Sequence, residues 1–229
     1  NASPYYTGFV TMHSGTLAIT NLNTALNSNT VALNTVTIAS GMNVWRSFNN
    51  TSIADSTSVA ITNLARNQRS TVLALNGDFG SRARFRLLGV SATVNSVNYV
   101  GGLATTGTKK SIVPYIVADT SYTGGGADFV NLNNASTSTT NVIVPLTSAE
   151  YAVYGSAAAG DNVRISAVVS PFVGTTINSL KIDSGTTTGY DLTGSGVLDI
   201  TSGALLFVGS KAQTINGFSA LTTGAVTPI

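Results

Sequence analysis

Charged residues are scarce in this sequence, and their scarcity excludes several classes of protein. They make up 9% of the 229 residues, against about 25% in an ordinary soluble domain. Hydrophobic residues reach 43%, so the chain does not have the composition of a disordered protein. The net charge of +2 gives no general attraction to nucleic acid, and no nucleic-acid partner is expected.

Cysteine is absent, which excludes disulfides, thiolate metal sites and a cysteine nucleophile. A secreted protein with a large core does not need disulfides, so the absence is compatible with export. The uncharged residues 87–108 are interrupted by glycine, asparagine, serine and threonine, so no membrane span is expected. The start of the chain shows no signal peptide, which is typical of a mature or trimmed chain.

Helical periodicity is also nearly absent, because Gly, Asn, Ser and Thr occur every few residues. Between them lie short β-branched runs with the two-residue alternation of strands. These runs predict strands at residues 36–38, 59–61, 72–75, 112–117, 142–144, 163–165, 197–200 and 205–208. One short helix is predicted at residues 147–151, where Thr147 and Glu150 fit a capping box.

The last third of the chain has an internal rhythm. Residues 177–182 are followed about twenty residues later by residues 197–200, and a similar step leads to residues 215–221. A repeat of this length, built from short strands and turns, is typical of one turn of a β-solenoid. An ordinary β-sandwich also shows short strands and turn signals, so the pattern alone leaves both folds open.

The same region resembles a known family. Residues 177–182 (INSLKI) and 192–206 (LTGSGVLDITSGALL) resemble the passenger repeat of autotransporter-associated β-strand repeat proteins, which are large surface proteins of planctomycete-like bacteria. Weaker similarity, in a consistent order, extends upstream through residues 64–67, 112–117, 127–129, 145–147 and 161–165. The resemblance implies a right-handed parallel β-helix, export, and a role at the cell surface or in a matrix.

The resemblance favours the solenoid and divides the chain. We expect residues 46–229 to form the solenoid and residues 1–45, which match the family poorly, to form cap or arm strands. Residues 1–45 contain no Lys, Arg, Asp or Glu, so this segment is suited to pair with another molecule by β-augmentation. The family's repeat has a second glycine where this chain has Ala204.

Catalytic signatures are few, and we expect no enzyme, no cofactor and no metal site. His13 is the only histidine, and no G-x-S-x-G pattern is present to supply a serine nucleophile. Polysaccharide cleavage needs two carboxylates at a fixed separation. Asp183, Asp191 and Asp199 are spaced so that they lie along one flank of a solenoid, but nothing in the sequence makes them converge. A polysaccharide-degrading enzyme is therefore the least favoured alternative.

The sharpest local pattern is at residues 81–87, where arginine alternates with apolar residues. In a strand, Arg82, Arg84 and Arg86 share one face, while Phe85 and Leu87 face the core. Three guanidinium groups in a row suit an anionic glycan or an acidic neighbouring subunit. The alternative is an exposed strand that uses its charges to prevent edge pairing.

Taken together, the sequence predicts an extracellular, all-β structural protein of the cell surface or matrix. We expect it to form a homo-oligomer or polymer, as a filament or lattice. An adhesin that binds cell-surface polysaccharide through its arginines is the main alternative.

Overall fold

The computed structural model describes residues 5–20, 29–48, 57–67, 69–76, 79, 83–88, 100–103, 106–121, 126–133, 141–167, 172–184 and 190–223. It is nearly all β and forms a β-solenoid of about 6 turns. The predicted parallel β-helix is confirmed, and the β-sandwich alternative is wrong because successive strands stack in parallel rather than in two antiparallel layers. No helix in the described residues is long and apolar enough to cross a membrane.

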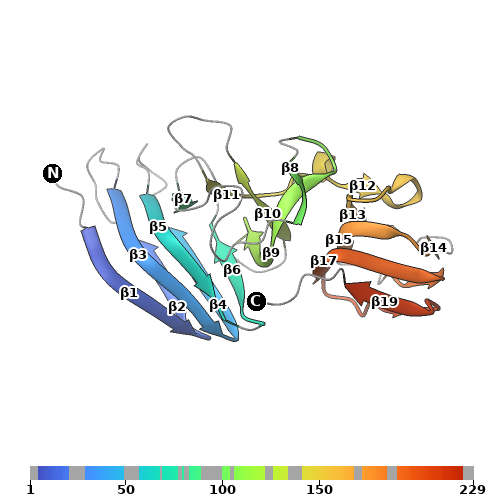
Figure 1. The fold of residues 1–229 in the computed structure, drawn as a ribbon, viewed down its shortest axis with the longest axis horizontal. Coiled ribbons are helices and arrows are strands. Elements are labelled where there is room, and N and C mark those ends of the chain that lie inside the picture. The colour runs from blue at the N-terminus through green and yellow to red at the C-terminus, as the bar shows by residue number, and fades with distance from the viewer. Residues whose placement is uncertain are drawn as a thin grey trace.

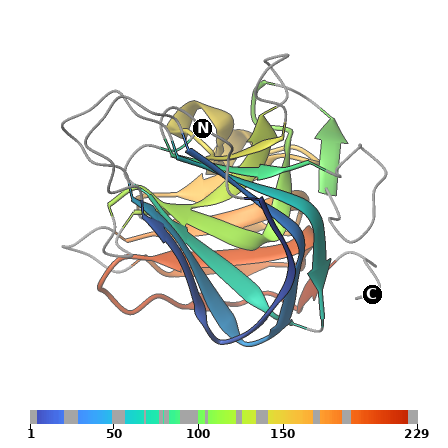
Figure 2. The ribbon, with the colours of Figure 1, turned by 90° about the vertical axis from the view of Figure 1, so that its left-hand side faces the viewer.

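The N-terminal half contains two parallel stacks of strands (Figure 1). One stack consists of β1 (Tyr5–His13), β3 (Asn29–Ser40), β5 (Thr57–Arg66) and β7 (Ala83–Leu87). The other consists of β2 (Thr16–Thr20), β4 (Met42–Phe48), β6 (Thr71–Leu75) and β9 (Lys110–Asp119). Figure 2 views these strands from the N-terminal end, where β1 and β2 lie outermost.

Each N-terminal turn is long. The Gly15 N–H donates to Asn43 Oδ1, 28 residues later, and His13 contacts Ser40, 27 residues later. Asn43 is fully buried at the corner between β3 and β4, and its side-chain amide also donates to the Ser40 carbonyl. Residues 5–20 and 29–48 thus belong to the first two turns of the stacks, and β4 runs across the boundary predicted between residues 45 and 46.

Antiparallel strands interrupt the solenoid in the middle of the chain. β10 (Ala127–Asn133) pairs with β9, β11 (Val142–Pro145) pairs with β10, and β11 also pairs with β7. These strands join the last strands of the two stacks and close the sheet at that end. β8 (Val100–Leu103) pairs with β9 outside this path. We call β8–β11 the junction.

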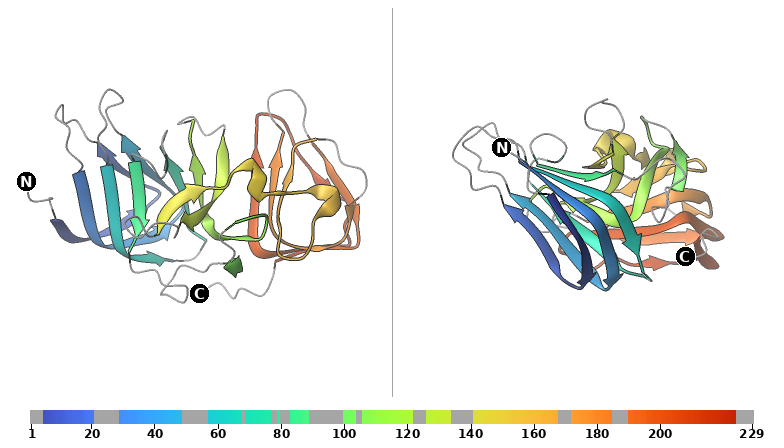
Figure 3. Two further views of the ribbon diagram at one scale, coloured as in Figure 1. Left: turned by 90° about the horizontal axis from the view of Figure 1, so that it is seen from above. Right: turned by 60° about the vertical axis from the view of Figure 1, so that its left-hand side comes forward.

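The C-terminal half is a second run of parallel turns (Figure 3). Its larger sheet consists of β12 (Ala152–Val153), β13 (Asn162–Ile165), β15 (Thr176–Asp183), β17 (Val197–Val208) and β19 (Ala220–Thr223). Its smaller sheet consists of β14 (Phe172–Val173), β16 (Leu192–Ser195) and β18 (Ile215–Asn216). Here the turns are shorter: Thr222 contacts Asp199, 23 residues earlier, and Thr201 contacts Ile177, 24 residues earlier.

Three apolar clusters hold these parts together. The N-terminal cluster contains an aromatic pair, Trp45 and Phe85, with ring centroids 5.5 Å apart. The C-terminal cluster is mainly aliphatic and lies between the two C-terminal sheets. A third cluster brings Phe129 of the junction and Tyr151 against Ala204 of β17, so the outer face of the larger C-terminal sheet is packed against the junction.

The strands predicted from the sequence are present in the structure, and the predicted helix is shorter than expected. Every predicted strand lies within a strand of the structure. The predicted helix is a single 3-10 turn, η1 (Ser148–Glu150), in which the Thr147 N–H donates to Glu150 Oε2 at 2.8 Å. A second 3-10 turn, η2 (Tyr154–Ser156), follows β12.

Candidate functional sites

The arginine face predicted at residues 82–86 is partly described. Phe85 and Leu87 are buried in the core, and Arg84 and Arg86 are half-buried on the opposite face of β7. Arg82 lies outside the described residues. The neighbours opposite Arg84 and Arg86 in β5 are Ser58 and Ala60, so no acidic residue of β5 lies directly opposite these two arginines.

The residues considered for catalysis are dispersed. His13 is exposed at the end of β1, where its Nδ1 lies 3.1 Å from Ser40 Oγ. Asp191 accepts a hydrogen bond from the Thr214 N–H, and Asp199 accepts one from Thr222 Oγ1. Asp183 is the last residue of β15, whereas Asp199 lies in β17 beside the first residue of β15.

The separation of Asp183 and Asp199 excludes them as a catalytic pair. Asp199 lies opposite Thr176, the first residue of β15, whereas Asp183 is the last. Seven residues of strand place the two carboxylates roughly 20 Å apart, which exceeds the separation of about 5–10 Å used by glycosidases. Within the described residues, no group of three or more His, Asp or Glu side chains is placed to hold a metal ion.

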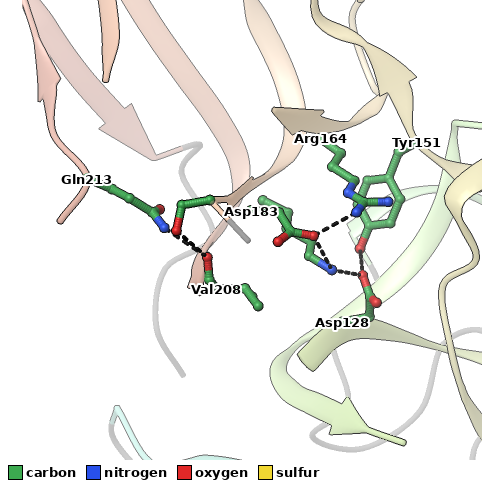
Figure 4. A network of polar contacts seen from close by, with 8 residues as sticks. Asp128, Tyr151, Arg164, Asp183, Val208 and Gln213 are labelled. Carbon is green, nitrogen blue, oxygen red and sulfur yellow. Dashed lines mark hydrogen bonds and ion pairs between the residues drawn. The ribbon is translucent and has the colours of Figure 1, made fainter. Parts of the chain in front are cut away.

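A different cluster of ionisable side chains lies where the junction meets the C-terminal turns (Figure 4). Lys181 Nζ is 2.6 Å from Asp128 Oδ1 and 3.7 Å from Asp183 Oδ2. Arg164 donates to Asp183 Oδ2 at 2.7 Å, and the Tyr151 hydroxyl donates to Asp128 Oδ1 at 2.9 Å. We call these five residues the junction cluster.

Burial distinguishes Lys181 from the other charged members of the junction cluster. Its side chain is 3% exposed, against 22% for Asp128, 17% for Asp183 and 33% for Arg164. Burial, and then the nearby Asp128 carboxylate, raise the pKa of Tyr151 far above its usual value, so its hydroxyl keeps its proton as a donor. Tyr151 and Arg164 also line an open pocket of ≈ 270 Å³.

The sheet geometry explains how this cluster forms. Lys181 lies opposite Arg164 in β13 and opposite Leu206 in β17. Because side chains alternate across a strand, Lys181 and Asp183 share the outer face of β15, which faces the junction. The lysine is therefore held between the larger C-terminal sheet and β10.

Sequence reasoning missed the junction cluster because its members are far apart along the chain. Its one local signal is Lys181-x-Asp183, a cation and an anion on the same face of a strand that is otherwise poor in charge. In the sequence, Asp128 is notable only as part of residues 127–129, one of the segments that resemble the family. The structure instead places it in β10, paired with Lys181.

The two ends of the solenoid also stand out. At the N-terminal end β1 pairs only with β3, and β2 only with β4, among the described residues. At the other end β19 pairs with β17 through residues 197–200 of β17, and residues 201–208 have no described partner on that side. Exposed large apolar side chains lie on these end strands, namely Phe9 (75%), Val197 (46%), Phe207 (47%) and Leu221 (48%).

Comparison of the chain with protein-family models, with curated proteins and with solved structures gives no match. The resemblance to autotransporter-associated repeats stays a prediction.

Proposed function

We propose that this chain is an extracellular structural protein of the cell surface or matrix, and that its copies assemble end to end through the two ends of the solenoid. The observation that carries the proposal is the pair of strand edges at those ends. Among the described residues, β1, β2 and β19 have no strand partner on their outer side, and neither do residues 201–208 of β17.

The scarcity of charged side chains near these edges favours pairing of the edge strands with another copy. Natural β proteins commonly place Lys or other charges on exposed edge strands to prevent association. Residues 1–45 contain no charged side chain, and residues 200–229 contain only Lys211. Phe9 on β1 is 75% exposed, so the N-terminal edge offers apolar surface as well as free backbone groups.

Head-to-tail stacking fits the parallel arrangement of the strands. The C-terminal strands run crosswise to the N-terminal strands (Figure 1). The next copy must therefore be rotated as well as translated for its N-terminal edge to meet this C-terminal edge with the strands parallel. Such a contact joins two different surfaces, so it does not close on itself and extends into a filament. The strand spacing across the contact would equal the usual spacing of about 4.8 Å.

A charge placed on the edge tests this proposal. Phe9→Lys on β1 is expected to lower the assembled fraction about tenfold or more, because a lysine at the contact must be desolvated. Val153→Lys is the matched control, since Val153 is also 75% exposed but lies on β12, away from both ends. Sedimentation velocity measures the assembled fraction. Equal assembly of Phe9→Lys and the wild type would contradict the proposal.

The second candidate is an adhesin that binds anionic glycan through the arginine face. Its support is that Arg86 Nε is buried without a hydrogen-bond partner among the described residues, beside the small side chain of Ala60. An Arg84→Gln/Arg86→Gln variant is expected to lose binding to polygalacturonate in glycan-affinity electrophoresis, whereas Lys211→Gln keeps it. Equal retardation of both variants would rule out this site.

A further inference from the structure

The environment of Lys181 is unusual for a lysine. Lysine is almost never fully buried unless it is paired, and Lys181 is 3% exposed with two carboxylates near its amine. The nearer carboxylate, Asp128, belongs to the junction, whereas Asp183 belongs to the same strand as the lysine. A buried amine between a carboxylate of another element and a second acid is an arrangement that supports amide formation.

We propose that Lys181 and Asp128 react with each other to form an intramolecular isopeptide bond, which links β15 of the C-terminal half to β10 of the junction. The bond would be a covalent cross-link in a chain that contains no cysteine. The inference depends on the junction cluster alone and not on end-to-end assembly.

The geometry holds the two reacting groups together. β15 is paired on both sides, with β13 and β17, and β10 is paired on both sides, with β9 and β11. With Nζ 2.6 Å from Asp128 Oδ1, the amine already contacts the carboxyl group that it must attack. When two reacting groups are held in contact, the reaction becomes effectively unimolecular, and the effective molarity of one group at the other reaches about 10⁵ M or more.

The reaction balances without any co-reactant. The Lys181 ammonium first passes a proton to the Asp128 carboxylate, which leaves a neutral amine and a carboxylic acid. The Nζ lone pair attacks Cγ of Asp128, a C–N bond forms, and the carbonyl electrons move to Oδ1. When the carbonyl forms again, the C–Oδ2 bond breaks. The products are one amide and one water, made from the ammonium and the carboxylate.

The neighbouring side chains have separate roles in these steps. The Tyr151 hydroxyl donates to Asp128 Oδ1, so it stabilises the negative charge that develops on this oxygen. Asp183 Oδ2, 3.7 Å from Nζ, accepts a proton from the attacking nitrogen and returns it to the leaving oxygen. The pocket beside Tyr151 and Arg164 gives the water a way out.

Charge pairing is satisfied both before and after the reaction. The junction cluster starts with two cations, Lys181 and Arg164, and two anions, Asp128 and Asp183. Amide formation removes one charge of each sign and leaves Arg164 paired with Asp183 at 2.7 Å. Since a buried ion pair is costly to desolvate, converting the lysine and its partner into a neutral amide lowers that cost.

The salt bridge between Lys110 and Glu150 provides an internal comparison. The side chains of Lys110 and Glu150 are 17% and 15% exposed, so this lysine is more exposed than Lys181. Burial works to raise the pKa of Glu150, but hydrogen bonds from Lys110 and from Thr147 outweigh it and lower the pKa. Among the described ion pairs Lys110 contacts Glu150 alone, with no second carboxylate to take a proton from its amine, so Lys110 is the matched control.

Mass spectrometry of the folded 229-residue chain tests the proposal. After incubation and denaturation, the wild type and Lys110→Met are expected to weigh one water less than their sequences, whereas Lys181→Met and Asp128→Ala keep their full mass. Trypsin should leave one branched peptide that joins residues 111–164 to residues 165–211, because the modified Lys181 is not cleaved. A folded wild type of full mass that trypsin cleaves after Lys181 would overturn the proposal.

The rate of the mass change tests the assigned roles. Asp183→Asn is expected to slow bond formation about a hundredfold, the size of a typical general acid–base contribution, while circular dichroism shows an unchanged β spectrum. Tyr151→Phe should slow it by a similar factor through loss of the hydrogen bond to Oδ1. Wild-type rates in both folded variants would contradict the mechanism.

Discussion

The two halves of this solenoid reach the same parallel architecture with turns of different size and different interiors. Paired residues of neighbouring N-terminal strands are 26–29 residues apart, and 44 apart between β6 and β9, and these turns enclose Trp45 and Phe85. From β13 onward, paired residues of the C-terminal strands are 17–25 residues apart, and these turns enclose mostly Ile, Leu and Val. A longer turn leaves room for aromatic rings, whereas a shorter turn closes on aliphatic side chains.

Buried polar side chains occur in both halves, but they are arranged differently. In the C-terminal half Asn178 Nδ2 and Ser179 Oγ both donate to Asn162 Oδ1 at 2.7 Å, and Asn162 Nδ2 donates to the Lys110 carbonyl at 2.8 Å. All three of these polar residues are fully buried. This ladder runs between strands and carries the C-terminal turns onto β9, whereas in the N-terminal half the buried Asn43 bonds backbone groups at the corner between β3 and β4.

The largest effect is expected from removing the aromatic centre of the N-terminal half. Trp45 is fully buried, and its Nε1 donates to Met12 Sδ at 3.4 Å. Trp45→Ala should lower the free energy of unfolding by about 3–5 kcal/mol. Urea denaturation measures the change, and Met42→Ala, at a 60% exposed position of the same strand, should stay within about 0.5 kcal/mol of the wild type. Similar values for the two variants would mean that ring packing does not support the long turns.

A variant that breaks the hydrogen bond between Asn178 and Asn162 tests what stabilises the C-terminal half. Asn178→Ala removes a donor to Asn162 Oδ1 and should lower the free energy of unfolding by about 1–3 kcal/mol. Asn216, which is exposed in β18, supplies the control variant Asn216→Ala. If chemical denaturation gives the two alanine variants the same midpoint, the ladder is not what stabilises the short turns.

The tight corners of the C-terminal half provide a steric test. A Cβ at Gly174 would lie 2.4 Å from the backbone N and O of Val197 in the next turn. Gly174→Ala should therefore cost about 1–3 kcal/mol through forced displacement of the backbone. At Gly155 a Cβ would meet nothing within 4 Å, so thermal melts of Gly155→Ala should match the wild type. A Gly174→Ala protein with wild-type stability would show that the short turns can expand.

The smallest expected effect is the acid response at η1. Because the folded state lowers the pKa of Glu150, its ionisation stabilises the fold above the unfolded pKa of about 4.5, and this contribution is lost as the pH falls through the lower folded value. Glu150→Gln should cost less than about 1 kcal/mol near neutral pH and should make unfolding less sensitive to acid. Urea titrations at neutral and acid pH would refute this if the wild type and Glu150→Gln lost stability in parallel.

Local strand patterns were predictable because alternation and β-branching are properties of neighbouring residues. The C-terminal repeat was predictable for the same reason, since Ile177 and Ile200 are paired and recur in similar surroundings. The N-terminal turns share no recurring motif. Their parallel stacking is set by contacts 26 or more residues apart, which the pattern of a single strand does not contain.

The junction and its cluster were not predictable for a related reason. Antiparallel and parallel strands have the same alternation of side chains, so nothing local distinguishes β10 from the strands around it. Lys181 has the polarity of a surface residue in the sequence, and only the packing of β15 against β10 buries it. Tertiary contacts therefore decide the surroundings of the most chemically distinctive residue in the chain.

End-to-end assembly is the central claim, and cryo-electron microscopy of the concentrated chain tests it most directly. The account predicts filaments in which the C-terminal edge of one copy contacts the N-terminal edge of the next, with the spacing of about 4.8 Å between strands continuing across each contact from β19 and β17 into β1 and β2. Isolated particles at every concentration, or arrays joined only through their sides, would contradict it.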